Sequence, residues 1–232
     1  MLLIEDGIIR TKVLFIKDHH VCVKVIAGGT LKSKKGVNIP DSKLPAALAL
    51  NAKDKKDLSF GIKLGVDAVA ASFVESAADI LRVKKEITKR TERKIPVIAK
   101  IERKDALVNL KEIIDAADGI MVARGDLGIE TKAERVPVEQ KRMVALARKM
   151  GKPSIIATQI LQSMVTSPIA TRAEVSDAAT AIFDHADAFM LSNETAVGAY
   201  PIKAVATLAK VAHETEEAIF SYEELSPALS SN

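Results

Sequence analysis

The sequence predicts an α/β fold with a parallel sheet, preceded by a short all-β segment. Five short apolar segments recur along the chain, and each is too short and too continuously apolar for a surface helix, which indicates strands covered on both faces. The segments are "VDAVAASF", "IPVIAKIE", "GIMVARGD", "PSIIATQI" and "DAFMLSNET". Their polar ends, at positions 72, 100, 124, 158 and 192, are 24 to 34 residues apart, the length of one strand, one helix and two loops.

The composition is that of a folded globular protein. Of 232 residues, 48% are apolar and 28% charged, and the net charge is +4. With two Tyr, six Phe and no Trp, the chain has few side chains on which bases could stack. We therefore interpret the mildly basic balance as a solvated surface and expect no nucleic-acid partner.

The same residues indicate a cytoplasmic location. Cys22 is the single cysteine, so no internal disulfide can form and a reducing compartment is expected. Glu5 and Asp6 interrupt the apolar N-terminal stretch, which argues against a signal peptide. No run approaches the roughly 20 apolar residues of a membrane span, so we expect no membrane partner.

The first 43 residues differ from the rest. They contain two strand-like segments, "IIRTKVLFI" and "VCVKVIA", followed by the Gly- and Lys-rich stretch "GGTLKSKKGVNIP". We expect a small all-β unit that joins the α/β part near Pro40 to Pro45. Within it, Lys32, Lys34 and Lys35 are interpreted as an exposed hairpin tip, with contact to an anionic ligand as the alternative.

Helices are predicted between the five strands. The first begins at the capping-box pattern Ser76-Ala77-Ala78-Asp79, and Ile80, Val83 and Ile87 lie on one of its faces. A second apolar stripe consists of Leu107, Leu110, Ile113 and Ile114.

Two further helices follow. Met143, Val144 and Ala147 form a stripe that should end at Gly151, since Pro153 comes just after it. A last long helix is expected after Pro201, marked by Ile202, Val205, Leu208 and Ala209.

Polar side chains follow every predicted strand. In parallel α/β folds, ligands bind beyond the carboxyl ends of the strands. Here those ends carry Ser72, Lys100 and Glu102, Arg124 and Asp126, Thr158 and Gln159, and Ser192 and Glu194. We interpret this edge of the sheet as the functional site.

Lys100, Glu102 and Asp126 carry the predicted chemistry. Lys100 and Glu102 are two apart on a strand, so they leave the same face, and the neighbouring strand should bring Asp126 beside Glu102. Two carboxylates with open positions suit Mg²⁺ or Mn²⁺, and the lysine can stabilise negative charge on a substrate held there. The alternative is that Lys100 and Glu102 only screen each other.

The "ARGD" corner, residues 123 to 126, explains part of this site. Gly125 lacks a Cβ, so the backbone can come close to a ligand, and a helical turn after it would direct N–H groups there. For Arg124 we favour a structural role, in which it pairs with a buried acid. The four histidines lack zinc-ligand spacing, and the chain has no P-loop and no G-x-G-x-x-G motif.

Taken together, these strings resemble the pyruvate kinase family. "IPVIAKIE", "GIMVARGDLGIE", "KPSIIATQILQSM", "TRAEVSDAATAIFD" and "DAFMLSNETAVGAYP" occur in the family's order and spacing, and "KKGVNIP" and "VDAVAASFV" extend the match upstream. The resemblance covers nearly all of residues 1 to 220.

The resemblance implies a partial TIM-type (β/α) barrel with a short all-β N-terminal lid remnant. Residues 1–43 are similar to the end of the family's lid domain, residues 44–220 to the last five strand–helix units of its eight-stranded barrel, and residues 221–232 form a tail. The implied reaction is phosphoryl transfer from phosphoenolpyruvate to ADP, which gives pyruvate and ATP in glycolysis. Implied cofactors are Mg²⁺ (or Mn²⁺) and K⁺, and a homo-oligomer is expected.

Site roles follow from the same resemblance. Lys100 matches the lysine that stabilises the transferring phosphoryl group, and Glu102 and Asp126 match the metal ligands. Gly125 and Asp126 match backbone contacts to the substrate carboxylate, and Thr158 matches the threonine beside the substrate's methylene carbon. Ser72, Arg124 and Glu194 are expected near the site without an assigned role.

The sequence also departs from the family. Asn193 stands where the family has Gly in Ser-Gly-Glu-Thr. Asn tolerates left-handed backbone better than most residues, so we expect the turn to be kept, while a close ligand approach at this position is left open. The family's first three barrel strands, its K⁺ ligands, a phosphate-holding arginine and its C-terminal domain have no counterpart in these 232 residues. Activity is therefore expected to be impaired.

Two other functions remain open from the residues. One is a Mg²⁺-dependent lyase on a β/α barrel, acting next to a pyruvate-type enolate, since such lyases also use a Glu–Asp metal pair. The other is a non-catalytic fragment that serves as an interaction module.

Overall fold

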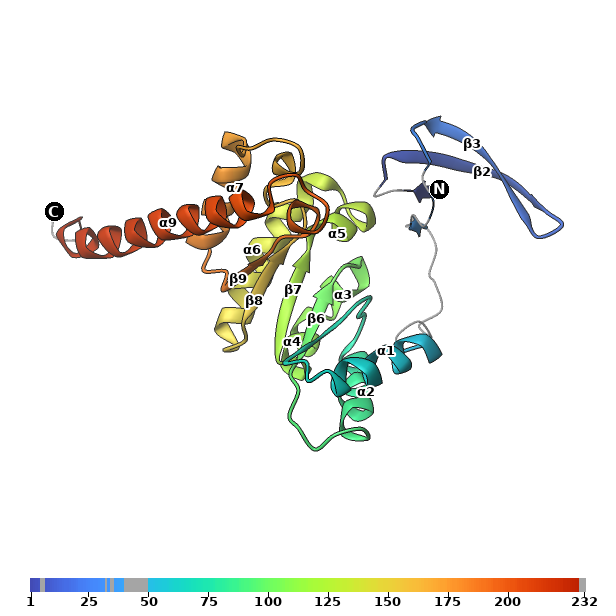
Figure 1. Cartoon of the computed structure of the whole chain (residues 1–232), viewed down its shortest axis with the longest axis horizontal. Coiled ribbons are helices and arrows are strands. Elements are labelled where there is room, and N and C mark those ends of the chain that lie inside the picture. The colour runs from blue at the N-terminus through green and yellow to red at the C-terminus, as the bar shows by residue number, and fades with distance from the viewer. Residues whose placement is uncertain (5–6, 32, 34–35, 40–49, 230–232) are drawn as a thin grey trace.

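Two sheets make up the strand content of the residues that the structure describes. The computed structural model describes residues 1–4, 7–31, 33, 36–39 and 50–229 (Figure 1). One sheet is four-stranded with the order β3-β2-β1-β4, and the other is five-stranded with the order β5-β6-β7-β8-β9. The four-stranded sheet comes first along the chain, and the five-stranded sheet follows it.

The N-terminal sheet is antiparallel. It comprises β1 (Leu2–Ile4), β2 (Ile9–Lys17), β3 (His20–Ala27) and β4 (Val37–Asn38). Asp18 and His19 join β2 to β3 with φ angles of 47° and 61°, the backbone of a two-residue hairpin turn that follows the twist of the strands. Figure 1 shows β2 and β3 as a long paired ribbon. The predicted lysine cluster and the predicted junction lie outside the described residues.

The second sheet is parallel, as predicted. Its strands are β5 (Val69–Ala71), β6 (Val97–Ile101), β7 (Gly119–Ala123), β8 (Ser154–Ala157) and β9 (Ala188–Met190). All five predicted segments therefore contain a strand, and neighbours in sequence are neighbours in the sheet. In the described part of the chain the sheet stays open, with β5 and β9 at its edges.

Helices alternate with these strands. The α-helices are α1 (Ala52–Lys63), α2 (Ala77–Thr88), α3 (Lys104–Val108), α4 (Leu110–Ala116), α5 (Arg124–Glu130), α6 (Val136–Lys149), α7 (Arg172–Phe183), α8 (Asn193–Ala196) and α9 (Pro201–Leu229). Short 3₁₀ turns occur at Ala133–Arg135 and Gln162–Val165. Helix α4 contacts α2 and α6, while α2 contacts β6 and α6 contacts β7 and β8.

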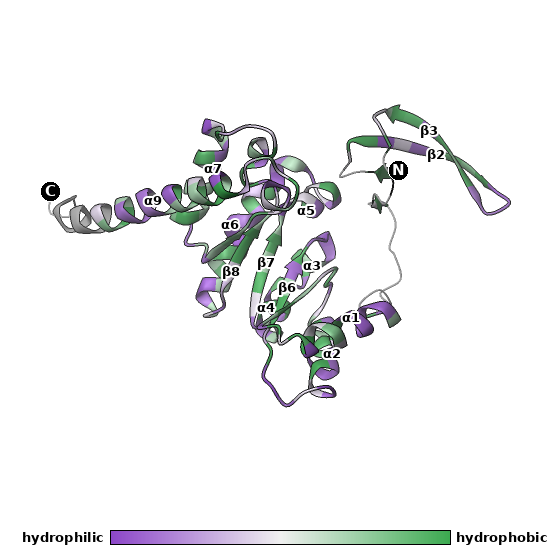
Figure 2. Cartoon of the chain, viewed as in Figure 1, coloured by the Kyte–Doolittle hydropathy of each residue, from purple (hydrophilic) through white to green (hydrophobic). Residues whose placement is uncertain are grey.

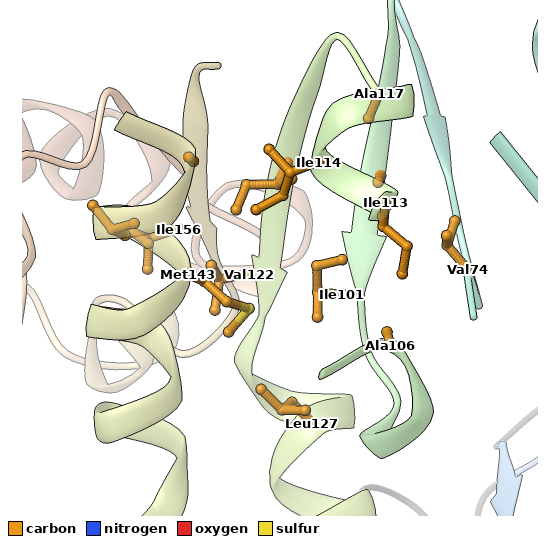
Figure 3. Close-up of a cluster of buried hydrophobic side chains, with 14 of the residues drawn as sticks. Val74, Ile101, Ala106, Ile113, Ile114, Ala117, Val122, Leu127, Met143 and Ile156 are labelled. Carbon is orange, nitrogen blue, oxygen red and sulfur yellow. The ribbon is translucent and has the colours of Figure 1, made fainter. Parts of the chain in front are cut away.

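The core lies between this helical layer and the strands. Ile101, Val122 and Ile156 from the strands meet Ile113 and Ile114 of α4 and Met143 of α6 (Figure 3), and all six are fully buried or nearly so. Figure 2 shows the strands as the most hydrophobic part of the α/β unit. Burying such side chains, at roughly 1.5 to 3 kcal/mol each, is the main stabilising contribution.

The prediction that all five strands are covered on both faces holds only for the central one. All five residues of β7 are buried, whereas β6 alternates buried with half-buried residues, and β5 and β9 have exposed or half-buried residues throughout. The reason is position: β7 lies in the middle of the sheet with two strands on each side, whereas β5 and β9 are edge strands.

The helix predictions are confirmed with one correction. Ser76 and Asp79 form the capping box of α2, and α6 ends before Gly151, which has a φ of 65°. The second stripe, however, belongs to two short helices that break at Asn109, whose side-chain amide donates to Glu75 O at 2.8 Å.

The last predicted helix is α9, and it includes residues 221–229. The assignment of residues 221–232 to a tail stays a prediction. Two of the apolar positions that predicted this helix, Ile202 and Val205, are exposed to solvent. Ala204, which lies between them, is buried instead. Of the helices that the structure describes, none combines the length and the apolar character needed to cross a membrane.

Candidate functional site at the carboxyl ends of the strands

The register of the parallel sheet brings the predicted polar ends together. Ala71 lies opposite Ala99, Ala123 opposite Ala157, and Ala157 opposite Met190. The residues that follow these positions are Ser72, Lys100, Arg124, Thr158 and Leu191. Because the strands are parallel, these residues lie towards one end of the sheet, with Lys100 opposite Met121, three positions before Arg124.

Lys100 and Glu102 form an ion pair on one face of β6. Lys100 Nζ lies 2.6 Å from Glu102 Oε1 and donates to Ser72 Oγ at 2.9 Å. Glu102 is only 1% exposed, and its Oε2 accepts the N–H of Phe73 at 2.6 Å. The predicted common orientation of the two side chains is confirmed, and Ser72 is added to the pair.

Glu102 restrains the backbone of Phe73, the second residue after β5. Its φ of 55° is unusual for a residue with a bulky side chain, and such strain persists only where the surroundings hold it. The hydrogen bond to the buried carboxylate of Glu102 provides that restraint. Glu102 therefore links the end of β6 to the end of β5.

The corner after β7 is a short helix that starts directly at the strand end. Gly125 N donates to Thr158 Oγ1 at 2.7 Å, and a Cβ at Gly125 would lie 3.3 Å from that oxygen. The structure thus places Gly125 directly against Thr158, and its predicted close approach to a ligand stays a prediction. Asp126 is half-buried in the first turn of α5.

Arg124 has the structural role that the sequence favoured. Its Nη1 lies 2.6 Å from Asp177 Oδ2 of α7 and 3.4 Å from Gln140 Oε1 of α6. The other guanidinium N–H groups donate to the carbonyls of Thr158 and Gln159. The predicted buried acid needs correction, because the Asp177 side chain is 42% exposed while that of Arg124 is 10% exposed.

Glu194 is fully buried and also bonds to backbone. Its Oε1 accepts Leu161 N at 3.1 Å and its Oε2 accepts Ser192 N at 2.9 Å. Asn193 begins α8 and has no positive φ, so the turn does not use the left-handed backbone that Asn tolerates. A Cβ at Gly198 would lie 2.4 Å from Glu194 O, so the chain is packed closely at that glycine.

A second charge cluster lies next to this edge. Arg103 forms an ion pair with Glu75 and lies 4.0 Å from Glu130 Oε2. Burial raises the pKa of Glu130; Arg103 and Lys104 oppose the shift, whereas Asp105 and Glu75 add to it. The cluster connects α3 to the end of α5.

Sequence reasoning missed several residues of this edge. Asp177 and Gln140 lie on helices α7 and α6 without a strand-end position, and Leu161 and Phe73 act through their backbone N–H groups. Asp177 lies within the string "TRAEVSDAATAIFD", which carried the family resemblance without a role for this residue. No side-chain pattern could have revealed the two backbone donors.

Two clefts border the site. One of about 1090 Å³ is lined by Leu3 and Arg10 of the N-terminal sheet and by Arg124, Gly125 and Glu130 of α5. The other, of about 630 Å³, runs along the β5 edge and reaches Ser72 and Phe73. The described residues contain no group of three or more His, Cys, Asp or Glu side chains arranged to hold a metal ion.

Comparison with known proteins agrees with the motifs and the fold. The model of the pyruvate kinase barrel domain matches residues 1–205. The chain belongs to the pyruvate kinase family.

Similar relatives carry the same name. The chain is 46% identical over 220 residues to pyruvate kinase of Geobacillus stearothermophilus, covering 94% of this chain and 37% of that protein. It is 49% identical over 220 residues to pyruvate kinase 2 of Synechocystis sp., covering 93% and 36% respectively. It is 47% identical over 214 residues to pyruvate kinase of Thermococcus litoralis, covering 92% and 45%. The chain thus spans less than half the length of these curated relatives.

Proposed function

We propose that the strand-end site transfers the phosphoryl group of phosphoenolpyruvate to ADP, giving pyruvate and ATP. The observation that carries this proposal is the Lys100–Glu102 pair, 2.6 Å apart at the carboxyl edge of the sheet in a chain of the pyruvate kinase family. Phosphoryl transfer depends mainly on positioning and on neutralising charge. A lysine held by a buried carboxylate and by Ser72 suits that task.

The donor chemistry fits Mg²⁺ or Mn²⁺ held by Glu102 and Asp126. Magnesium is usually bound by one or two carboxylates and completed by substrate oxygens and water, so two acids suffice. When bound, the cation would neutralise charge on the substrate oxygens. Both Glu102 oxygens already accept hydrogen bonds, but a carboxylate has further lone pairs for a cation. For K⁺, which the family uses, we assign no residue of this chain.

Lys100 and Thr158 have the reactive roles in this proposal. The Lys100 ammonium group stabilises the charge that develops on the transferring phosphoryl group. Thr158 Oγ1 accepts the N–H of Gly125, which leaves its own O–H free to donate. It can therefore pass a proton to the methylene carbon of the enolate that remains after transfer, while a solvent water returns a proton to the hydroxyl.

The substrate carboxylate is assigned to the N–H groups of Gly125 and Asp126. Because Gly125 N–H is engaged with Thr158 Oγ1 at 2.7 Å, a bound carboxylate must share this donor with the threonine. Substrate binding and the position of the Thr158 hydroxyl are therefore coupled in this proposal.

The finer organisation belongs to the same proposal. We assign residues 1–43 to a lid remnant, residues 44–220 to part of a (β/α) barrel and residues 221–232 to a tail. The open parallel sheet and the separate N-terminal sheet support this division. A cytoplasmic location rests on the single cysteine, and a homo-oligomer on the exposed sheet edges.

Purified chain incubated with phosphoenolpyruvate, ADP and Mg²⁺ tests the proposal through coupled detection of pyruvate and ATP. Lys100→Met should lower turnover by about 100-fold or more, since a single electrostatic group of this kind contributes roughly 3 to 4 kcal/mol. The matched control is Lys84→Met, because Lys84 pairs with Asp118 at the other end of the sheet. Pyruvate formation no faster than without protein, or full turnover in Lys100→Met, would contradict the assignment.

A further inference from the structure

The turn after β8 has an unusual backbone. Thr158 and Gln159 have φ angles of 67° and 54°, so two consecutive residues with side chains adopt the left-handed conformation. This conformation is unfavourable for residues with a Cβ, and Thr is β-branched. Strain of this kind persists only where the surrounding structure holds it in place.

Arg124 holds the turn from the side of β7. Its Nε and Nη2 donate to Thr158 O at 3.2 and 3.1 Å, and Nη2 also donates to Gln159 O at 2.8 Å. Asp177 and Gln140 anchor Nη1. The planar guanidinium is thus held by side chains at Nη1 and by the two carbonyls at Nε and Nη2, which fixes its orientation.

Glu194 holds the same turn from the side of β9. Its buried carboxylate accepts Leu161 N and Ser192 N. A buried carboxylate is costly unless hydrogen bonds satisfy it, so both N–H groups are kept in place. The segment Thr158–Leu161 therefore lies between a nearly buried cation and a fully buried anion.

We propose that Arg124 and Glu194 are positioning residues that together set the Thr158 hydroxyl against the N–H of Gly125. The turn carries Thr158, and Oγ1 lies 2.7 Å from Gly125 N, so any rotation of the turn moves this oxygen. The meaning for catalysis rests on the proposed function, in which Thr158 contacts substrate. The positioning itself is a property of the fold.

Amide hydrogen exchange measured on the full chain tests the positioning. The variants are Arg124→Met, Arg124→Lys and Glu194→Gln. Two matched controls remove similar bonds elsewhere. Arg93→Met removes an arginine that donates to the carbonyls of Gly65 and Val66, and Asp187→Asn alters a carboxylate that accepts the N–H of Ser154 at the start of β8.

Arg124→Met and Glu194→Gln should each speed exchange at Gly125 by about tenfold or more relative to Val122 in the centre of β7, because the acceptor Oγ1 moves away. Arg124→Lys should lie between Arg124→Met and the unchanged chain. Neither control variant should change the ratio of the exchange rate at Gly125 to that at Val122. A ratio that stays within about twofold of the unchanged chain would overturn the proposal, as would an equal rise at Gly125 and Val122, which indicates loss of the whole fold.

Steady-state kinetics supply a second readout. If the hydroxyl position matters to catalysis, the two main variants should lower kcat about tenfold or more with KM changed less than about threefold, and Arg124→Lys should restore part of kcat. An unchanged kcat with faster Gly125 exchange would overturn the catalytic meaning. If the unchanged chain makes no pyruvate, the proposed function fails, while the exchange measurement still decides the positioning.

Discussion

Charged residues at the strand ends bond to backbone as well as to one another. Glu102 holds Phe73, Arg124 holds Thr158 and Gln159, and Glu194 holds Leu161. Each links the end of one strand to the segment after its neighbour. The polar residues that the sequence predicted for the site therefore also hold the backbone of the site in place.

Metal binding gives a prediction for two of these residues. Asp126→Asn and Glu102→Gln should each weaken Mn²⁺ affinity by tenfold or more, about 1.4 kcal/mol, because each removes a charged oxygen ligand. Titration calorimetry or the Mn²⁺ resonance signal measures the effect. Asp115→Asn and Glu112→Gln, both exposed on α4, are matched controls. Affinity that is unchanged in both site variants would remove the assignment.

At the residue scale, side-chain chemistry was easier to predict than side-chain partners. The common face of Lys100 and Glu102 followed from strand periodicity, and the structure confirms it. The partners of Arg124 could not be predicted, because Asp177 lies 53 positions away on α7. The start of α8 at Asn193 could not be predicted, because no capping or periodic pattern in the sequence marks it.

At the scale of elements, α7 shows how one carboxylate can fix a helix start. Glu174 accepts the N–H groups of Ser163 and Thr171, and Thr171 Oγ1 accepts Glu174 N in return. Burial alone would raise the pKa of Glu174, but the hydrogen bonds from Ser163 and Thr171 together outweigh it and lower the pKa below 4.5. The charged form therefore stabilises the fold.

This lowered pKa predicts a pH dependence. The contribution of Glu174 is present above its ordinary pKa and is lost as the pH falls through the lower folded-state value. Glu174→Gln should lower Tm by about 2 to 4 °C at pH 7, for a loss of about 1 kcal/mol, and the difference should shrink towards pH 3. Thermal unfolding at several pH values measures it, with Glu216→Gln, exposed on α9, as control. A difference that is the same at pH 7 and pH 3 would contradict this account.

The sequence predicted where helices and strands occur, but it did not predict where a helix is interrupted. The capping box of α2 and the exit of α6 follow from local residues, namely Ser76, Asp79 and Gly151. The break at Asn109 depends on a tertiary contact, since its side chain donates to Glu75 O, 34 positions away. The apolar stripe of residues 107–114 contains no sign of it.

At the scale of the whole molecule, the sheet has two unpaired edges in the part that the structure describes. Ala70 in β5 and Ala188 in β9 are exposed. Exposed edges favour pairing with another chain. We expect residues 1–232 alone to associate in solution or to aggregate, with turnover below the about 10 per second of a typical enzyme.

Sedimentation measures this association. Ala70→Lys and Ala188→Lys place a charge on each edge and should shift the chain towards monomer. Ala145→Lys, on the exposed side of α6, should not. A monomer of the unchanged chain with an ordinary turnover would contradict the expectation.

The gradient of burial across the sheet has a consequence for partial unfolding. Local opening begins where few apolar contacts must break, so the sheet should open from β5 and β9 inward and reach the fully buried β7 last. Arg124, Gly125 and Asp126 follow β7 directly, whereas Ser72 and Ser192 follow the two outer strands. Local opening would therefore displace Ser72 and Ser192 first, while residues 124–126 after β7 keep their positions and the site can re-form around them.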